Sequence, residues 1–403
     1  IQPEDFKGLL PRLLVKEGDR VLAGSPVLSD KKNPDIIVAA PTSGTVKEVV
    51  RGEKRKLLAV LIQTDGKQEY LDFGKKNPAE LSAEEVKSAR LAGGLWPVFV
   101  QRPYGIIADP ALTPKGIFVS AINAAPAAAD VEFAYGEQIA ALQAGIDALG
   151  KICPVHISFD AKRYSGSNFS RLKGCEVHLF QGKYPVGNVG VQISHISPIR
   201  KDETVWTVSM HGLAAIGKLF LKGRYDMLHM VAVGGPAAIQ PAYISTLPGM
   251  PFSELKPFYG ADANGVRLIS GNIFSGRAVG EQGYLGFADD CITIIKEGTD
   301  KSLDWCLGWL TPGRKYDMDT NLHGGPRAFV MSDGYYSKYL PMDIYPIYLA
   351  KACLAGDIEK MAKFGIYEVL PEDLAICEYV DPSKNYIQEM IAKGIDLMLK
   401  EMA

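Results

Sequence analysis

The residues of this chain with the widest chemical repertoire are its cysteines, because thiolates bind metals, hold iron–sulfur clusters and act as nucleophiles. The chain has six, and no two of them are separated by fewer than 15 positions. They are Cys153, Cys175, Cys291, Cys306, Cys353 and Cys377. This spacing excludes a local Cys-x-x-Cys ligand set for zinc or an iron–sulfur cluster. Scattered thiols are typical of proteins in a reducing compartment.

Two adjacent lysines, Lys31 and Lys32, lie in a glycine-punctuated stretch from Val15 to Val49. This stretch resembles the domains that carry lipoate or biotin on a lysine at a hairpin, shortly before an Ala-Pro-x-x-Gly-x-Val strand. That strand is present as Ala40–Val46, but the lysines lie ten and nine residues before Pro41, one or two too many. An Asn-Pro dipeptide also interrupts the turn. We therefore expect a barrel-sandwich scaffold with no covalently bound cofactor, and a carrier protein modified at Lys32 is the weaker alternative.

Composition favours a multidomain globular protein. A chain of 403 residues exceeds what one ordinary core organises, and 47% hydrophobic with 22% charged residues is typical of well-packed proteins. The formal net charge of −2 and the absence of a basic stripe give no reason to expect nucleic acid as a partner. The uncharged run Met227–Ser253 is long enough to span a bilayer, but its four prolines argue against a membrane helix. No signal peptide is visible, so we expect a soluble chain that reaches any membrane by docking.

The elements that position these residues divide the chain into four units of a multidomain α/β and α+β protein. Residues 1–80 read as short strands with glycines at the bends, typical of a biotinyl/lipoyl-like barrel-sandwich. Residues 81–225 alternate strands with helices, which favours a Rossmann-like α/β domain. Residues 226–300 contain, in this order, a strand, a turn, a second strand and a short helix. This β-hairpin followed by a helix suggests a β-grasp-like domain. Residues 301–403 begin with aromatic-rich loops and end in helices.

The second unit has clear local signals but no nucleotide fingerprint. Ser82 is a predicted N-cap, and Gly93 follows the end of the same amphipathic helix. A ligand crevice is expected at the carboxyl ends of the strands of such a sheet. After the predicted strand Ile117–Val119, however, the turn Ala121–Ala129 contains no G-x-G-x-x-G sequence. A bound pyrophosphate is therefore not expected there.

Several stretches, from near residue 12 to beyond residue 385, together carry a family resemblance. They read "KEGDRVLAG", "RPYGIIADPALTPKGIFVSAINAAPAAAD", "HISPIRKDETVW", "GGPAAIQP", "LPMDIYP" and "LPEDLAICEYVDPSKNY". In order and spacing the chain resembles the A-subunit family of the sodium-translocating NADH:quinone oxidoreductase, the NqrA family.

The resemblance implies a peripheral subunit without a transmembrane helix, on the cytoplasmic face of the bacterial inner membrane. The complex would pass electrons from NADH through flavins to ubiquinone and export Na⁺, with membrane and flavin-bearing subunits as partners. The resemblance also implies a further segment before Phe6, including one barrel strand.

The same architecture is similar to RnfC and to the flavin-carrying, NADH-oxidising subunit of complex I. Those relatives hold FMN with a glycine-rich loop, where this chain has Gly93–Val98 with the bulky Leu95 and Trp96. They carry an acidic turn where this chain has Asn123–Pro126, and clustered cysteines where it has only Cys377. The comparison implies a subunit for assembly and docking, without FMN, NADH or an iron–sulfur cluster, and not catalytic by itself. The alternative is an electron-input subunit that binds NADH and FMN.

The NqrA resemblance makes a quinone the candidate ligand. His323 and Arg327 share a glycine-rich loop suited to a carbonyl or an anion, while Tyr335 and Tyr336 offer rings that stack on a quinone or bury against a neighbouring subunit. His195 is a second candidate donor, although a histidine packed in a loop is the simpler interpretation. We expect no catalytic residue and no metal site.

Overall fold

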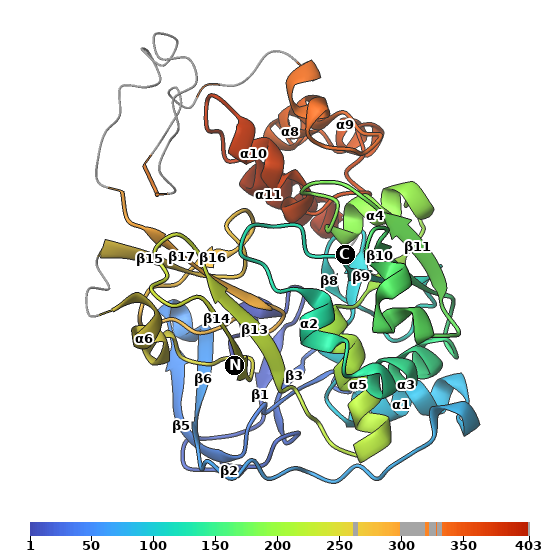
Figure 1. The fold of residues 1–403 in the computed structure, drawn as a ribbon, viewed down its shortest axis with the longest axis vertical. Coiled ribbons are helices and arrows are strands. Elements are labelled where there is room, and N and C mark those ends of the chain that lie inside the picture. The colour runs from blue at the N-terminus through green and yellow to red at the C-terminus, as the bar shows by residue number, and fades with distance from the viewer. Residues whose placement is uncertain (261–264, 299–318, 322–327, 329–332, 402–403) are drawn as a thin grey trace.

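The computed structural model describes residues 1–260, 265–298, 319–321, 328 and 333–401. The C-terminal helices lie at one end of the long axis, and the N-terminal strands lie toward the other (Figure 1). Among the described residues, no helix combines the length and apolar character that crossing a bilayer requires.

Two three-stranded sheets, ordered β1-β3-β4 and β2-β5-β6, form the N-terminal unit. The strands are β1 Pro11–Leu13, β2 Arg20–Val21, β3 Pro26–Asp30, β4 Ile37–Ala39, β5 Gly44–Arg51 and β6 Leu57–Thr64. Buried side chains such as Val27, Val46 and Val60 form the core between them. Gly44 is required where β5 meets β6, because a Cβ there would lie 2.1 Å from the carbonyl oxygen of Gln63.

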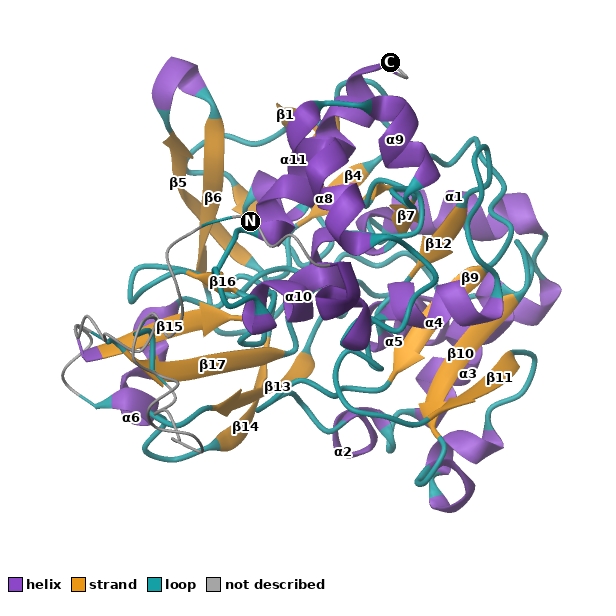
Figure 2. Cartoon of the chain, turned by 90° about the horizontal axis from the view of Figure 1, so that it is seen from above, coloured by secondary structure: helices purple, strands orange, loops and turns teal. Residues whose placement is uncertain are grey.

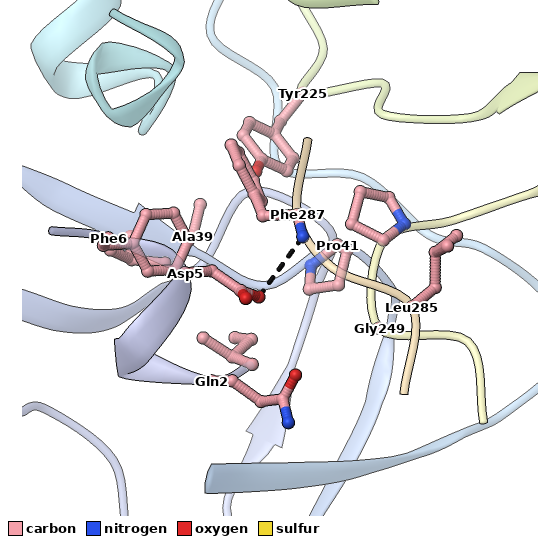
Figure 3. Close-up of a pocket in the computed structure, with 12 residues that line it drawn as sticks. Gln2, Asp5, Phe6, Ala39, Pro41, Tyr225, Gly249, Leu285 and Phe287 are labelled. Atoms are coloured by element: carbon pink, nitrogen blue, oxygen red, sulfur yellow. Dashed lines mark hydrogen bonds between the residues drawn. The ribbon is translucent and has the colours of Figure 1, made fainter. Parts of the chain in front are cut away.

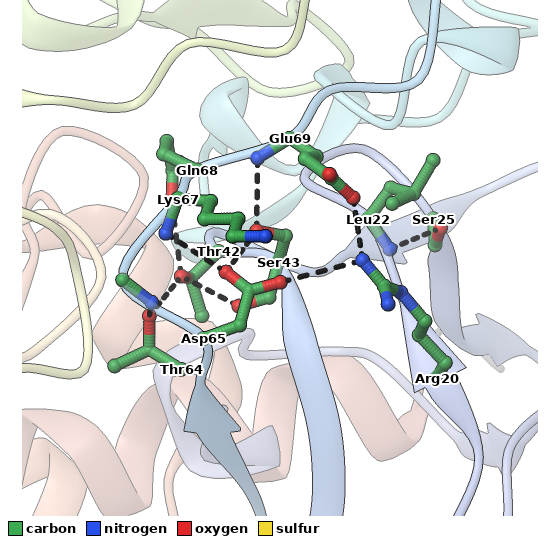
Figure 4. Close-up of polar contacts among 11 residues, drawn as sticks. Arg20, Leu22, Ser25, Thr42, Ser43, Thr64, Asp65, Lys67, Gln68 and Glu69 are labelled. Carbon is green, nitrogen blue, oxygen red and sulfur yellow. Dashed lines mark hydrogen bonds and ion pairs between the residues drawn. The ribbon is translucent and has the colours of Figure 1, made fainter.

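A polar network closes one end of this unit (Figure 4). The Ser43 hydroxyl donates to the Asp65 carboxylate at 2.8 Å and accepts from the backbone N–H of Glu69 at 2.9 Å. The Arg20 guanidinium pairs with the Glu69 carboxylate at 2.5 Å. These contacts fasten the segment that follows β6 across the strands, so the unit ends in an ordered strap rather than a free linker.

A six-stranded sheet, ordered β11-β10-β9-β12-β7-β8, forms the second unit. Its strands are β7 Val100–Arg102, β8 Ile106–Ile107, β9 Ile117–Ala121, β10 Val155–Asp160, β11 Glu176–Phe180 and β12 Val205–Thr207. The first four strands in the order are parallel, while β7 and β8 are antiparallel additions. Its helices are α1 Ala83–Ala92, α2 Val131–Tyr135, α3 Ile139–Leu149, α4 Val189–Ile196 and α5 Met210–Lys222. A capping box between Ser82 and Glu85 begins α1, which confirms the predicted N-cap.

Side chains along β9 point alternately to the two faces of this sheet, and each face packs against helices. Ile117 and Val119 are buried in the same core cluster as residues of α3 and α5, which pack side by side (Figure 1). Phe118 points the other way and packs against Ile193 of α4. The unit is thus a mainly parallel sheet between two helical layers. The more specific name Rossmann-like for this unit, and the name β-grasp-like for residues 226–300, stay predictions.

The third unit is a five-stranded sheet ordered β14-β13-β17-β15-β16. Its strands are β13 His229–Gly234, β14 Ala242–Thr246, β15 Val266–Ser270, β16 Arg277–Ala278 and β17 Cys291–Lys296. The predicted hairpin and following short helix are confirmed as β13, β14 and α6 Lys256–Tyr259. The central strands β13 and β17 pair in parallel, although most other pairings are antiparallel.

The C-terminal unit is helical, and its helices form one group in the view from above (Figure 2). They are η10 Asp333–Lys338, α8 Pro346–Ala355, α9 Ile358–Lys363, η11 Pro371–Leu374, α10 Ala375–Val380 and α11 Ile387–Glu401. Along α11, Ile387, Ile391, Ile395 and Met398 recur every three or four residues and are buried. This stripe faces the core of the unit, as an amphipathic helix requires.

A buried ion pair joins the C-terminal unit to the six-stranded sheet. The Arg102 guanidinium on β7 contacts the carboxylates of Asp373 at 2.7 Å and Glu372 at 3.0 Å, both on η11. The side chains of Arg102 and Asp373 are 2% and 0% exposed. Burial alone would lower the pKa of Arg102, but the two carboxylates raise it above its ordinary value. Gly190 makes room for the pair, because a Cβ there would lie 2.2 Å from the Asp373 carboxylate.

Replacing Arg102 by methionine keeps most of the side-chain volume but leaves Asp373 buried without its counterion. We expect the free energy of unfolding to fall by about 3–5 kcal/mol, the usual cost of removing one member of a buried pair. Urea denaturation followed by circular dichroism measures this change. The control is Arg267→Met, since the Arg267–Glu297 pair has partners 43% and 31% exposed and such surface pairs contribute about 0–1 kcal/mol. Equal effects of both substitutions would contradict a charge-based junction.

Candidate functional site

A cleft of about 300 Å³ lies where the strand order of the six-stranded sheet reverses. The chain proceeds from β9 to β10 and β11 on one side, then returns to place β12 on the other side of β9. Strands β9 and β12 pair in parallel there, so their carboxyl ends lie at the same edge of the sheet, which is where α/β sheets characteristically bind ligands. Ser120 and Asn123 line the cleft from the end of β9, and Thr207 to Gly212 line it from β12 and the start of α5.

The third unit supplies the opposite wall of the cleft, and this wall is acidic rather than basic. Asp290, Phe287 and Ala288 line it, together with Asp5 from the N-terminal segment. Burial raises the pKa of Asp5 and of Asp290 above the ordinary range for a carboxyl group. None of the described residues that line this cleft is a lysine or an arginine. The cleft therefore disfavours phosphate and other anions.

Most polar groups of the cleft already have partners. The Asn123 amide donates to the Asp290 carboxylate and to the backbone carbonyl of Ala129, both at 2.9 Å, so it links the second unit to the third. The Ser120 hydroxyl donates to the carbonyl of Gly187 at 2.9 Å. The exception is Tyr135, whose hydroxyl is buried and has no hydrogen-bond partner among the described residues. A ligand with a carbonyl oxygen would satisfy this donor.

The first turn of α5 presents neutral groups to the cleft. Ser209 caps the helix by accepting the backbone N–H of Gly212 at 3.0 Å. The His211 ring is stacked on His229 at 3.8 Å, and its Nε2 lies 3.2 Å from the carbonyl oxygen of Met227. Burial, and secondarily His229, lowers the pKa of His211 well below its ordinary value. His211 is therefore uncharged at neutral pH and does not attract anions to the helix start.

A second hollow, between the N-terminal and third units, is too small for an organic ligand (Figure 3). Its volume is about 20 Å³, which is close to the space that one water molecule needs. The backbone N–H of Phe287 donates to the Asp5 carboxylate at 3.2 Å beside it. This hollow is a packing defect of the junction, and the larger cleft is the better candidate for binding.

The loop Gly93–Val98, which the sequence comparison set against the FMN-binding loop of the complex I subunit, is filled with side chains. Leu95 and Trp96 are both 0% exposed. The Trp96 ring contacts Trp206 edge-on at 5.5 Å, and its Nε1 donates to the carbonyl of Ala108 at 2.7 Å. The Arg90 guanidinium lies 5.5 Å from the centroid of the same ring. The loop thus forms part of the hydrophobic core.

The structure describes only part of the quinone site predicted from sequence. His323 and Arg327 lie outside the described residues. Tyr336 is 0% exposed and belongs to the core of the C-terminal helical unit, while Tyr335 donates its hydroxyl to the carbonyl of Val380 at 3.0 Å. The role of these four residues in quinone binding stays a prediction. The other candidate donor, His195, lies in helix α4 and not in a loop, so the interpretation as a loop histidine is wrong; its Nδ1 is 2.8 Å from the Val191 carbonyl.

The two lysines of the N-terminal unit lie on the turn between β3 and β4, and both are exposed. The Asp30 carboxylate accepts the backbone N–H of Leu10 at 2.9 Å and that of Asn33 at 3.1 Å. These bonds tie the turn back onto the unit. That neither Lys31 nor Lys32 carries a covalent group stays a prediction, and it rests on the spacing of the lysines in the sequence.

Sequence reasoning missed the residues of the cleft. The available signal was a hydroxyl or an amide directly after a buried strand, as in Ser120 and Asn123, because such positions gather at the carboxyl edge of a parallel sheet. Tyr135 gave no signal, since it lies on a short helix whose approach to the cleft depends on the packing of two units.

The buried histidine of the cleft predicts a pH dependence of stability. Its folded-state pKa is depressed below the unfolded value, so the stability it contributes is present above that value, about 6.5, and is lost as pH falls below it. We expect His211→Phe, which keeps a ring, to reduce the loss of thermal stability between about pH 7 and pH 5. Melting temperatures of both proteins across this range test the expectation. Identical slopes would contradict a buried, neutral His211.

Comparisons with known proteins agree with this architecture. Family models match residues 1–65 as the NqrA N-terminal barrel-sandwich hybrid domain, residues 81–225 as the NqrA second alpha/beta domain, and residues 230–281 as the NQRA C-terminal domain. The first of these descriptions confirms the predicted barrel-sandwich.

Full-length relatives extend the match. The A subunit of the Na(+)-translocating NADH-quinone reductase from Serratia proteamaculans is 35% identical over 407 residues, which cover 94% of this chain and 89% of that protein. The corresponding A subunits from Pseudomonas aeruginosa and Actinobacillus pleuropneumoniae are 34% and 32% identical and cover 94% and 99% of the chain. Similarity of this degree extends over nearly the whole sequence, and this chain therefore belongs to the NqrA family.

Proposed function

We propose that this chain is a peripheral subunit of a sodium-translocating NADH–quinone reductase. In this proposal it docks on the membrane and flavin-bearing subunits from the cytoplasmic side and serves assembly, without binding FMN, NADH or an iron–sulfur cluster. The names of its relatives, which are A subunits of that reductase, support membership of the complex.

The observation that carries the docking role is the filled loop. A phosphate cradle requires backbone N–H groups that a ligand can approach closely. Leu95 and Trp96 occupy that position with completely buried side chains. Among the described residues that line the nearby cleft, no lysine or arginine is present to compensate. Both features favour a subunit that holds others in place over one that receives electrons from NADH.

The surface of the C-terminal helical unit supports docking. Five of its tyrosines are well exposed: Tyr339 41%, Tyr345 55%, Tyr348 46%, Tyr379 62% and Tyr386 50%. Two of them adjoin Phe364, with ring centroids 6.0 Å (Tyr345) and 5.7 Å (Tyr348) from it. Exposed aromatic groups of this kind are enriched at protein interfaces, where a rigid ring contributes a large contact area.

Replacing Tyr345 and Tyr348 together by serine tests this surface. We expect recovery of the membrane subunits with the tagged chain, after mild detergent extraction, to fall at least about tenfold, since interface aromatics often contribute about 2 kcal/mol or more. The control is Ile239→Ser, which removes a side chain 62% exposed on the third unit. Failure of the wild-type chain to recover membrane subunits would contradict the docking role. Stoichiometric flavin in the purified chain would favour the electron-input alternative.

A second candidate function is quinone binding in the cleft at the strand-order reversal. The specific observation is Tyr135, a buried hydroxyl without a partner among the described residues. A quinone is uncharged, planar and carries carbonyl oxygens, so it suits a cleft whose described lining contains no lysine or arginine and includes one hydroxyl donor without a partner among the described residues. The volume of about 300 Å³ is at the lower end of small-molecule sites and fits a quinone ring.

Tyr135→Phe removes the hydroxyl and keeps the ring. We expect it to weaken binding of a soluble quinone about fivefold to tenfold, because one hydrogen bond contributes about 1 kcal/mol or slightly more. Quenching of the tryptophan fluorescence, to which Trp96 and Trp206 contribute, provides the measurement. Tyr335→Phe is the comparison, since it tests the site predicted from sequence. A loss confined to Tyr335→Phe would move the quinone away from the cleft, and no saturable quenching in the wild type would remove both sites.

A further inference from the structure

Three potential metal ligands converge on one face of the six-stranded sheet, away from the cleft. His156 lies on β10 directly opposite Glu176 on the parallel strand β11, and His178 follows two positions later on the same face of β11. Nδ1 of His156 is 3.1 Å from Nε2 of His178 and 3.3 Å from Oε2 of Glu176. All three ligand atoms lie within 4.8 Å of one another. In the described part of the chain, no other group of three such ligands converges in this way.

The surrounding residues fix the orientation of the His156 ring. It stacks on Phe118 with centroids 4.5 Å apart and an interplanar angle of 13°. Its Nε2 edge faces Gly116, where a Cβ would lie only 3.0 Å from that nitrogen. Nε2 is therefore turned toward the protein, and Nδ1 is turned toward His178 and Glu176.

The face is open enough for an ion to enter. The side chain of His156 is 12% exposed, that of Glu176 is 61% exposed, and His178 is half-buried. An ion held by these three groups would keep contact with solvent. A water molecule would then complete its coordination.

Two imidazole nitrogens and one carboxylate oxygen form a ligand set that suits zinc. Calcium and magnesium require more oxygen ligands than the cluster offers. In a tetrahedral zinc site with bonds of about 2.0–2.1 Å, neighbouring ligand atoms lie about 3.4 Å apart. The two shortest separations of the cluster, 3.1 Å and 3.3 Å, are close to that geometry before any ion is bound.

We propose that His156, Glu176 and His178 bind one zinc-type divalent cation at the edge of the six-stranded sheet. The ion would join the edge strand β11 to β10 through side chains, in addition to their backbone hydrogen bonds. Its binding would stabilise that edge of the sheet. The expectation of no metal site came from the absence of a local motif, whereas these ligands come from two strands that pair only in the fold.

Zinc titration of the untagged full chain, freed of metal with a chelator, tests the proposal. We expect calorimetry to show one ion bound per chain with micromolar or tighter affinity, and bound zinc to raise the melting temperature. Glu176→Gln, which keeps the shape of the side chain, and His178→Ala should each weaken binding at least about tenfold. Co²⁺ in place of zinc should give visible bands of nitrogen and oxygen ligation without a thiolate charge-transfer band.

Two control variants separate this cluster from nearby groups. Cys175→Ser removes a thiol that is next to Glu176 in the sequence and packs against the hydrophobic core. His195→Ala removes a histidine that lies outside the cluster. Both should bind zinc as the wild type does. Absence of one-to-one binding in the wild type would overturn the proposal. So would unchanged affinity in Glu176→Gln and His178→Ala, or a loss of binding in Cys175→Ser.

Discussion

The arrangement of the molecule depends on one buried charge cluster, in which a β7 arginine meets two consecutive carboxylates of η11. Removing Arg102 and Asp373 from water costs more free energy than an exposed ion pair gains. The attraction between the two side chains offsets this cost only because they approach to hydrogen-bond distance. Oδ2 of Asp373, which accepts from Arg102, also accepts the backbone N–H of Leu370 at 3.0 Å, whereas Oδ1 is buried with no hydrogen-bond partner among the described residues. The missing side chain of Gly190 keeps this space free. This contact, together with the packing of Tyr104 into the C-terminal core and the hydrogen bond from Asn188 to the Glu372 carbonyl, holds the C-terminal unit in place.

The loop around Trp96 and the cleft beside it differ in side-chain bulk and in charge, and therefore in the kind of ligand each could accept. In the loop around Trp96, the side chains of Leu95 and Trp96 are completely buried and form part of the core. The cleft beside it has kept space, but its walls carry hydroxyls, an amide, a neutral histidine and buried acids. An anion would lose its hydration in such a place and gain no counterion. An uncharged ring with a carbonyl oxygen would lose little and would satisfy Tyr135.

Local signals in the sequence predicted local structure well. The helix after Ser82, the strand at Ile117 and the hairpin that begins at His229 all depend on caps, turns and periodicity within a few residues, and each is present. The strand order of the six-stranded sheet depends instead on long-range pairing. No pattern in the sequence indicated that β12 returns beside β9, so the cleft could not be located.

The same limit explains the outcome for individual site residues. Tyr336 lacks neighbours with helical periodicity, so its burial in the C-terminal core was not predictable from its surroundings in sequence. His156 and His178 lie too far apart along the chain to form a recognisable motif. The barrel-sandwich was predictable because its glycines and its Ala-Pro-x-x-Gly-x-Val strand are local features.

The parallel pairing of β13 with β17 has a consequence for biosynthesis. On the ribosome the N-terminal barrel and the six-stranded sheet emerge complete, but the central position of the third sheet stays vacant until residue 296 has left the exit tunnel. Until then β13 has one hydrogen-bonding edge open to any other extended chain. While the segment between these two strands is being translated, the open edge of β13 is therefore exposed to mispairing.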